Sequence, residues 1–325
     1  MALQTRLTAR LGIEHPILSA PMAFAAGGKL AAAVSQSGGL GLIGGGYGDP
    51  AWLSGEFAAA GNARVGCGFI TWSLASQPAL LEQSLSHAPA AIMLSFGDPR
   101  PFAPAIKRAG SLLLCQVQSL AHACTALEAG AEVIIAQGTE AGGHGGTRAS
   151  FTLTPEIADF LARESPDTLL CTAGGVADGR GLAAALMLGA DGVLVGSRLW
   201  ASQEALVHPH HHRAAIAATG DDTIRQRAAD IIRRKPWPRE FTGRVLRNAF
   251  TDRWHGREQE LEREADRLHD GYMAGAAAGD PDDVAVWIGE VAGFVQDIPP
   301  AADIIKGMAY QAEHLLRERS VELAG

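Results

Sequence analysis

The sequence predicts an α/β fold of the (β/α)8 barrel type, the TIM barrel, with a helical insertion after the eighth strand. Eight short apolar runs of strand length recur through the first two thirds of the chain, and helical patterns separate them. Strands and helices that alternate at a repeat of roughly 20 to 35 residues are typical of parallel βαβ units. The runs are continuously apolar, as in strands buried on both faces. Eight such units favour a closed barrel over an open doubly wound sheet, which stays the alternative.

The expected strands follow one another along the first 200 residues or so. They lie at residues 16–22, 39–43, 65–69, 91–95, 112–117, 133–137, 169–173 and 192–196. Helical patterns lie between them at residues 30–36, 75–85, 104–108, 120–129, 155–163 and 181–188. Most of these helices end near a glycine, which suits the left-handed residue that caps many helices.

The character of the chain changes after Arg198. Residues 203–297 are charged, show helical patterns broken by prolines, and carry no strand-like run before Val286. Residues 301–319 place apolar side chains at helical spacing, which predicts a last helix packed on the barrel. The expected division is a barrel of residues 1–202 and 298–325 and a helical insertion of residues 203–297, which we expect to cover the barrel mouth as a lid.

Composition excludes several classes of protein. The chain has 325 residues, of which 47% are hydrophobic and 19% charged, so it is not a disordered chain. Its formal net charge of -8 argues against a general nucleic-acid binder. No apolar run reaches the roughly 18 residues of a membrane span, and the charged N-terminus does not match a secretion signal. We therefore expect a cytoplasmic protein with no membrane partner. The four cysteines form no Cys-x-x-Cys pair, so we expect neither disulfides nor a metal site.

Barrel enzymes carry their active sites at the carboxyl ends of the strands, so the residues after each apolar run are informative. The sixth run leads into residues 137–146 (QGTEAGGHGG), where His144 lies between two glycine pairs. Glycine allows the backbone to approach a ligand closely. His144 is the one group in this tip that can exchange a proton near neutral pH, so we expect it to be catalytic. A histidine without a role in a mobile turn is the alternative.

The loops after the seventh and eighth runs have the character of a phosphate site. In a barrel these two loops frequently bind phosphate through backbone N–H groups. Gly174, Gly175 and Gly196 leave that backbone bare, and the Ser197 hydroxyl can add a hydrogen bond. Glycines that only shape tight turns are the alternative. Asp178 is expected to cap the helix that follows.

The end of the first strand, residues 19–23 (SAPMA), combines small side chains with a proline, so a flat ring can lie against its backbone. At these three places the chain resembles the nitronate monooxygenase family, formerly called 2-nitropropane dioxygenases, which are flavin mononucleotide (FMN) enzymes with a barrel fold. The matching stretches are HPI through APM at residues 15–22, LAAAVSQSGGLG at 30–41, the loop at 137–146 and residues 173–198. The motifs QGxEAGGH and AGGxxDGRG are specific together, whereas either alone is weak.

The resemblance implies a flavoprotein that oxidises alkyl nitronates, with O2 as the second substrate, to a carbonyl compound and nitrite. His144 would lie beside the flavin and, for a neutral nitroalkane, remove the α proton. Gln116 would offer its side chain to the pyrimidine edge of the ring, and Met22 would contact the isoalloxazine through its backbone. The implied cofactor-binding residues are Ala20, Met22, Gln116, Gln137, Gly143, Gly174, Gly175, Gly196 and Ser197.

The chain departs from the family pattern at one strand end. Family members commonly have asparagine at the end of the third strand, whereas this chain has Gly66-Cys67-Gly68, so an amide that would contact flavin or substrate is missing. An FMN-dependent NAD(P)H reductase, similar to enoyl-acyl carrier protein reductases or quinone reductases, has similar loops and is the alternative function. A barrel that binds phosphate but no flavin is a third.

Two segments of the insertion carry their own predictions. Residues 208–212 (HPHHH) are expected to be a solvated loop and not a metal site, because no cysteine or carboxylate accompanies them. Residues 257–269 interleave both signs of charge at helical spacing. We expect this stretch to be a solvated helix face or a contact in a homodimer, because its acids balance its bases.

Overall fold

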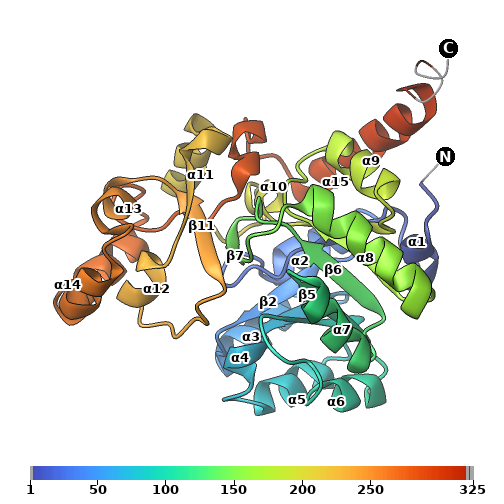
Figure 1. The fold of residues 1–325 in the computed structure, drawn as a ribbon, viewed down its shortest axis with the longest axis horizontal. Coiled ribbons are helices and arrows are strands. Elements are labelled where there is room, and N and C mark those ends of the chain that lie inside the picture. The colour runs from blue at the N-terminus through green and yellow to red at the C-terminus, as the bar shows by residue number, and fades with distance from the viewer. Residues whose placement is uncertain (1–2, 320–321, 323–325) are drawn as a thin grey trace.

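The structure is a computed structural model that describes residues 3–319 and 322, so the ends of the expected barrel segments at residues 1–2, 320–321 and 323–325 lie outside it. Eight parallel strands form one sheet in the order β1-β9-β8-β6-β5-β4-β3-β2 (Figure 1). They are β1 (Ile17–Ser19), β2 (Leu42–Gly46), β3 (Gly66–Ile70), β4 (Ala91–Ser95), β5 (Leu112–Val117), β6 (Val133–Gln137), β8 (Leu169–Ala173) and β9 (Gly192–Val195). A parallel bridge between Leu18 and Leu40 joins the two edge strands, so the sheet forms a nearly closed barrel. The predicted (β/α)8 barrel is confirmed.

Helices cover the outside of this barrel. They are α1 (Arg6–Leu11), α2 (Gly28–Gln36), α3 (Pro50–Ala60), α4 (Thr71–Leu74), α5 (Ala79–Ser86), α6 (Ala103–Arg108), α7 (Leu120–Glu128), α8 (Ser150–Glu164), α9 (Gly179–Met187), α10 (Ser197–Trp200) and α15 (Ala301–His314). Asp178 caps α9 as predicted, because its Oδ1 accepts from the Arg180 N–H at 2.9 Å. The predicted last helix is α15, whose apolar face, Ile304, Ile305 and Met308 among it, belongs to the outer core. No helix of the described ranges is both long and apolar enough to cross a lipid bilayer.

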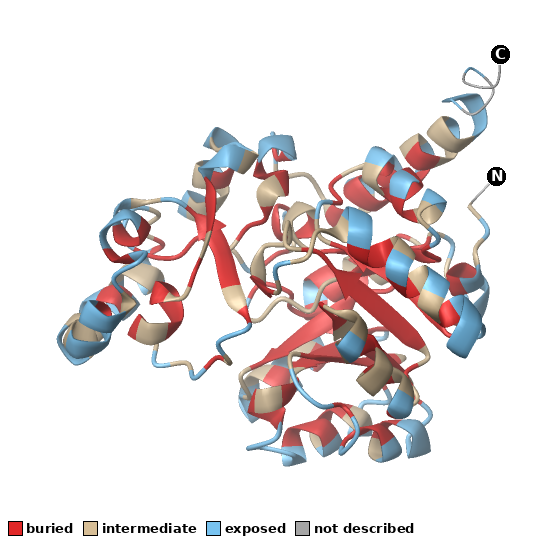
Figure 2. Cartoon of the chain, in the orientation of Figure 1, coloured by how far each residue is buried: buried red, intermediate tan, exposed pale blue. Residues whose placement is uncertain are grey.

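Side chains on each strand alternate between two apolar layers. Ile17 and Ile43 pack outward against the helices, whereas Leu18 and Leu42 point into the barrel interior. Both faces of the strands are therefore buried, which is why the runs are continuously apolar (Figure 2). Leu7 of α1 joins the interior layer next to Gly192, the first residue of β9. Helix α1 thus closes the amino-terminal end of the barrel and leaves the carboxyl ends of the strands to the site.

The segment between β9 and α15 is not purely helical. It holds the helices α11 (Pro209–Ala217), α12 (Ala228–Ile232), α13 (Ala249–Trp254) and α14 (Glu258–Ala278). It also holds two strands, β10 (Thr223–Gln226) and β11 (Thr242–Leu246), so the prediction of no strand before Val286 is wrong. Both strands are short and carry a central arginine, Arg225 or Arg244, held by hydrogen bonds, so neither resembles an apolar run.

The two strands of the insertion attach to the barrel's sixth loop. Strand β11 pairs antiparallel with β10 on one side and with β7 (Gly143–Gly145) on the other. In this register Gly243 lies opposite His144. The insertion also has its own apolar core, in which Val245, Phe250 and Leu261 are buried. The loop predicted to carry the catalytic residue is thus the third strand of the insertion's sheet.

The histidine cluster of the insertion also differs from the prediction. Residues 208–212 are not a solvated loop, because His208 caps α11 and the residues after it form the first turn of this helix. Proline at the first helical position, Pro209, favours this start. The ring of His212 forms a hydrogen bond with the Trp200 carbonyl at 3.0 Å. Throughout residues 3–319 no cluster of side chains is suited to hold a metal ion.

Candidate active site

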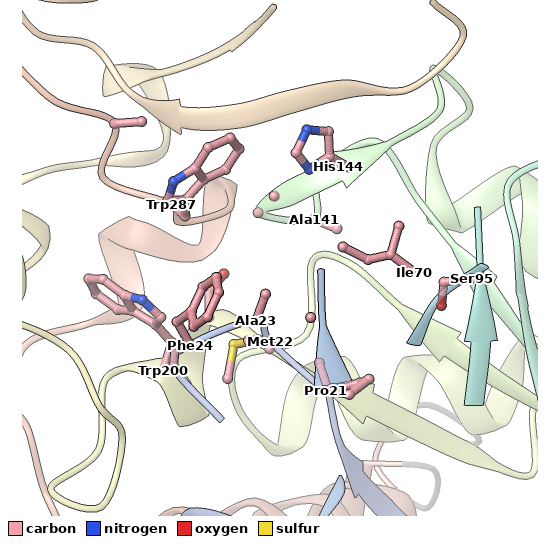
Figure 3. Close-up of a pocket in the computed structure, with 18 of the residues that line it drawn as sticks. Pro21, Met22, Ala23, Phe24, Ile70, Ser95, Ala141, His144, Trp200 and Trp287 are labelled. Carbon is pink, nitrogen blue, oxygen red and sulfur yellow. The ribbon is translucent and has the colours of Figure 1, made fainter. Parts of the chain in front are cut away.

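A cavity of about 900 Å³ opens at the carboxyl ends of the barrel strands and extends between the barrel and the insertion (Figure 3). Its volume falls within the range of small-molecule and cofactor sites. Barrel loops form its floor, and parts of α11, α14 and the turn after α12 also line it. Every residue predicted for the site lines this one cavity: Ala20, Met22, Gln116, Gln137, Gly143, His144, Gly174, Gly175, Gly196 and Ser197.

The turn after β8 is shaped to bind an anion. Gly174 and Gly175 have φ angles of +90° and +75°, which glycine adopts without strain. Within residues 3–319 no protein group accepts a hydrogen bond from the N–H of either glycine. A Cβ on Gly175 would make only ordinary van der Waals contacts with Ser150 and Glu140, at 3.7 Å or more. The two backbone N–H groups are therefore available to bind an anion such as a phosphate group.

Ser197 lies beside this turn at the start of α10. Its Oγ accepts a hydrogen bond from the Gly289 N–H at 2.9 Å, which leaves the hydroxyl proton free for a ligand. Gly196 precedes it, and a Cβ there would make only ordinary contacts with Ala20 and Met22. The ends of β8 and β9 thus supply converging donors, as the sequence predicts for a phosphate site.

The floor of the cavity offers few polar groups. Gln116 at the end of β5 is the register partner of Ser95 at the end of β4, and both line the cavity. No partner for either side chain is found in the part of the chain that the structure describes, so both can bind a ligand. Met22 also lines the cavity, but its N–H donates to the Ala20 carbonyl at 2.9 Å and its own carbonyl accepts from Ala26 at 2.9 Å. Both backbone groups of Met22 thus have protein partners, so a ring bound here would contact its side chain by packing.

The glycine at position 68, where the family resemblance leads us to expect asparagine, has a physical explanation. A Cβ on Gly68 would lie within 2.5 Å of the Pro21 ring. The proline at the end of β1 therefore fills the space that a side chain on β3 would need. In this chain Pro21 and Gly68 form one packed pair, and the floor at this point is apolar.

His144 is buried between two tryptophans. The indole of Trp237 stacks on the imidazole with 3.4 Å between centroids and 4° between planes, and Trp287 lies 5.2 Å away on a tilted plane. The imidazole Nε2 lies 2.8 Å from Oδ2 of Asp230, on α12. Figure 3 places the imidazole at the edge of the cavity opposite Pro21 and Met22. Its faces and its Nε2 are thus occupied by the protein.

The Asp230 carboxylate determines which nitrogen of His144 can act as a base. A carboxylate only accepts hydrogen bonds, so the neutral ring carries its proton on Nε2 and leaves the lone pair on Nδ1. Burial lowers the pKa of His144 below its usual value, although the bond to Asp230 opposes this effect. Asp230 is held in turn by Arg233, whose guanidinium lies 2.7 Å from its other oxygen. The resulting base is neutral near pH 7.

Buried amides hold the strand that carries His144. The Gln137 side chain donates through Nε2 to the His144 carbonyl at 3.0 Å, and its Oε1 accepts from Gln118 at 2.9 Å. Gln137 lines the cavity as predicted, but both ends of its amide bond to the protein. In this structure its main task is to fix β7, and Gln118 supports it.

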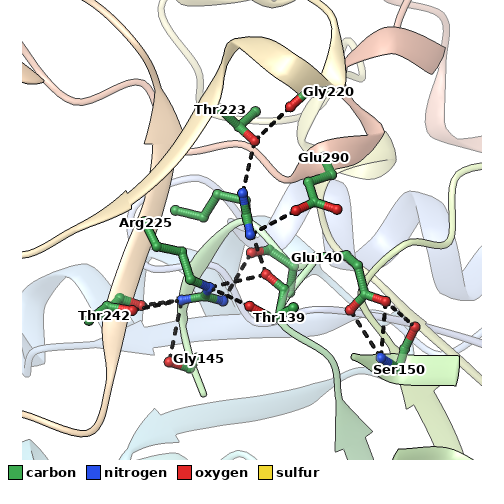
Figure 4. Close-up of polar contacts among 11 residues, drawn as sticks. Thr139, Glu140, Gly145, Ser150, Gly220, Thr223, Arg225, Thr242 and Glu290 are labelled. Carbon is green, nitrogen blue, oxygen red and sulfur yellow. Dashed lines mark hydrogen bonds and ion pairs between the residues drawn. The ribbon is translucent and has the colours of Figure 1, made fainter. Parts of the chain in front are cut away.

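Two arginines of the insertion clamp the same loop from the other side (Figure 4). Arg225 and Arg244 both donate through Nε to the Thr139 carbonyl, at 3.1 and 3.0 Å. Arg244 also forms an ion pair with Glu290 at 2.8 Å. Burial, helped by the charge of Arg244, lowers the pKa of Arg225 to about 10. These bonds tie residues 139–145 to β10 and β11.

Aromatic side chains form the outer wall of the cavity. Phe96 lies edge-on to Trp237 at 5.0 Å, and the Trp237 Nε1 donates to the Tyr47 hydroxyl at 2.9 Å. Phe24 and Phe96 both have positive φ angles, 60° and 65°, which are uncommon for large side chains. Such backbone strain clusters at functional sites. The wall leaves an apolar entrance around the polar groups of the floor.

Comparison with known proteins indicates the family of this chain. A family model described as nitronate monooxygenase matches residues 4–63 and 72–310. The chain belongs to the nitronate monooxygenase family. A nitronate monooxygenase from Neurospora crassa is 32% identical over 93% of this chain and 90% of its own length. The resemblance predicted from the motifs is thus confirmed, and the chain is an enzyme of an oxidoreductase family concerned with nitronates.

Solved structures confirm the fold of this nitronate monooxygenase family member. FabK from Thermotoga maritima superposes with a TM-score of 0.86 at 30% identity, covering 98% of this chain and 99% of FabK. A nitroalkane oxidase from Streptomyces ansochromogenes superposes with a TM-score of 0.77 over 97% of this chain and 99% of its own, at 24% identity. The barrel with its insertion is therefore shared across the full length.

The sequence did not reveal several residues of this family member's site. Asp230, Arg233 and Trp237 come from the insertion, roughly ninety residues along the chain from His144. Their segment shows no motif that points to the barrel. Ser95 is the last residue of an apolar run, so the sequence indicates a strand there and no role in the site. One signal in the sequence points to these residues: Arg233 follows Asp230 by three positions. This spacing is also common on solvated helices.

Proposed function

We propose that the protein binds FMN and oxidises alkyl nitronates, with O2 as the second substrate, to a carbonyl compound and nitrite. The observation that carries this proposal is the buried His144–Asp230 pair, placed on the same cavity as the bare glycine turn after β8. The family supports oxidation of nitronates in general. The residues of the cavity are the reason for proposing FMN as the cofactor and O2 as the second substrate.

The cavity fits a flavin mononucleotide. The N–H groups of Gly174 and Gly175 and the Ser197 hydroxyl would hold the phosphate, and Gln116 would bind the polar edge of the ring. Gly143 and Ala20 would let the ring lie close to the backbone, because neither carries a bulky side chain. A bound flavin supplies the electron acceptor for the substrate, while the protein orients both.

His144 would act on the proton of the substrate. Its Nδ1 accepts the α proton of a neutral nitroalkane, and the N–H formed there donates to an oxygen of the nitronate that results. Asp230 stabilises the imidazolium through Nε2, 2.8 Å away. Trp237 and Trp287 exclude water from both faces of the ring. A nitronate added as such needs no proton removal and depends less on this base.

Replacing Asp230 by asparagine is expected to lower kcat for a neutral nitroalkane by about 10- to 100-fold, part of the 10²–10⁴ that positioned proton transfer contributes. The neutral amide no longer stabilises the imidazolium, so the pH profile should also shift to lower pH. Turnover of preformed nitronate should fall less. The matched control is Asp266→Asn, whose side chain is 95% exposed and pairs with Arg234 on the surface. An Asp230→Asn enzyme with the wild-type profile for both substrates would remove Asp230 from the mechanism.

A reductase is the second candidate, because FabK from Thermotoga maritima superposes over 98% of the chain. Here the flavin would take a hydride from NADH or NADPH and pass it to an organic acceptor. The aromatic wall, with Trp237 and Tyr47 at the entrance, is suited to a flat ring of either kind.

One experiment distinguishes the two. The purified protein, loaded with FMN, is mixed anaerobically in a stopped-flow instrument with ethylnitronate, NADH or NADPH, and the absorbance of oxidised flavin is followed. We expect rapid loss of absorbance with the nitronate and slow or no loss with either nicotinamide. The reverse result assigns a reductase. A protein that takes up no FMN at all overturns both proposals.

A further inference from the structure

Lys235 is a cation on the wall of the active-site cavity with no carboxylate partner. It lines the cavity five residues after Asp230, and no acidic side chain pairs with it anywhere in residues 3–319. Its Nζ lies 4.5 Å from the centre of the Tyr47 ring. Burial, together with the charge of Arg233, lowers its pKa from the usual value. The ammonium group is therefore partly desolvated, held in place by an aromatic face, and free to take an anion.

The backbone directs Lys235 inward by an uncommon turn. Helix α12 ends in a motif in which the Lys235 N–H donates to the Asp230 carbonyl at 2.9 Å and the Arg234 N–H to Ile231 at 3.0 Å. Glycine usually occupies the left-handed position of this motif, but here Arg234 does, with φ of 56°. A third bond, from the Trp237 N–H to the Lys235 carbonyl at 2.9 Å, continues the turn. The same turn thus brings Asp230 and Trp237 into contact with His144. It also places Lys235 on the wall of the cavity.

The other charged or titratable groups that line the cavity have partners or stay neutral. Arg233 is paired with Asp230, and Glu140 accepts from the Ser150 N–H and hydroxyl. His269 bonds to the Ile232 carbonyl, and His208 accepts from the His210 N–H. Burial lowers the pKa of His211, so its ring is neutral near pH 7. Among the described residues that line the cavity, Lys235 is therefore the cation that no carboxylate pairs with.

We propose that Lys235 selects anionic substrates: its ammonium group draws the nitronate into the cavity and holds its negatively charged nitro group near His144. This inference rests on the proposed function and adds to it a residue that discriminates the nitronate from the neutral nitroalkane. The ligand class is a small organic anion with two oxygens in one plane. The residue binds the substrate, and the proton chemistry stays with His144.

The test compares Lys235→Met, which keeps the length of the side chain, with Lys235→Arg, which keeps the charge. For propyl-2-nitronate we expect the methionine variant to raise KM about tenfold or more with kcat within about twofold, since uniform binding is lost. The kcat/KM for neutral 2-nitropropane should fall less, because this substrate carries no charge when it binds and acquires one only as His144 removes its proton. The arginine variant should restore most of the affinity for the nitronate. The control for removal of a lysine charge is Lys306→Met, on the exposed side of α15.

A binding measurement separates this inference from the proposed function. Isobutyrate has the shape and charge of propyl-2-nitronate but cannot be oxidised in the same way. Titrated into the FMN-loaded protein and followed by tryptophan fluorescence, it should bind wild type and Lys306→Met alike, and Lys235→Met about tenfold more weakly. A wild type that binds isobutyrate more tightly than Lys235→Met does, and yet fails to oxidise nitronates, would reject the proposed reaction and keep Lys235 as an anion-binding residue. Equal isobutyrate affinity and equal nitronate KM in wild type and Lys235→Met overturn the inference.

Discussion

Replacing His144 by alanine is expected to lower kcat/KM for a neutral nitroalkane by about 10²- to 10⁴-fold, the range that a positioned base contributes. The FMN content should stay at the wild-type level, because the phosphate cradle of Gly174, Gly175 and Ser197 lies on other loops. Turnover of preformed nitronate should fall less, since no α proton has to be removed. The measurement is steady-state kinetics on both substrates, with the flavin spectrum as the check on loading.

The pH dependence of the wild type provides the companion result. Burial lowers the pKa of His144 below 6.5, so the base is unprotonated at neutral pH and is lost only as the pH falls through that lower value. Activity on the neutral nitroalkane should therefore be flat near pH 7 and decline in more acidic buffer, and this decline should be absent from the residual activity of His144→Ala. Wild-type turnover of both substrates by the alanine variant would contradict the assignment.

Replacing Gly175 by aspartate is expected to abolish stable binding of FMN. The new side chain would add a negative charge to the turn that we propose binds the phosphate, while the φ of +75° strains any residue with a Cβ. Loss of one charge-assisted hydrogen bond alone weakens binding by about 10- to 100-fold, and repulsion adds to this. The dissociation constant is measured by titrating FMN into the apoprotein and following quenching of flavin fluorescence.

Gly256→Asp is the matched control. Gly256 has nearly the same backbone angle, φ of +79°, and a Cβ there meets no atom within 4 Å. It therefore carries the same strain, but the residue lies in the turn between α13 and α14, outside the lining of the cavity. The two variants should lose similar stability, and only Gly175→Asp should lose FMN. Equal FMN affinity in both would place the phosphate elsewhere.

The barrel could be predicted because its strands obey a simple physical rule. Every strand lies between an outer layer of helices and a packed interior, as Ile17 and Leu18 show, so most of its positions are apolar. The candidate site followed from the fold, since parallel strands converge at one end of a barrel. Glycines with positive φ, such as Gly174 and Gly175, then mark where backbone faces the ligand.

The remainder of the site depends on tertiary contacts that leave no local pattern. Strands β10 and β11 are stabilised by Arg225 and Arg244, whose charges are satisfied by carbonyls of the 139–145 loop. In the sequence alone, residues 223–226 and 242–246 are two short stretches interrupted by polar residues, which do not indicate strands. The partner of His144 likewise depends on how α12 packs, because the distance along the chain from Asp230 to His144 carries no signal.

The pairing of β7 with β11 has a consequence for how such enzymes diversify. The strand that bears the imidazole is shared between two substructures, so neither can be exchanged without disturbing the register of the other. New specificities are therefore expected to arise by changes within the insertion, at its helices and turns, and seldom by grafting a whole insertion from another member. A chimera that joins this barrel to a foreign insertion would have to rebuild the Gly243–His144 register before it could turn over substrate.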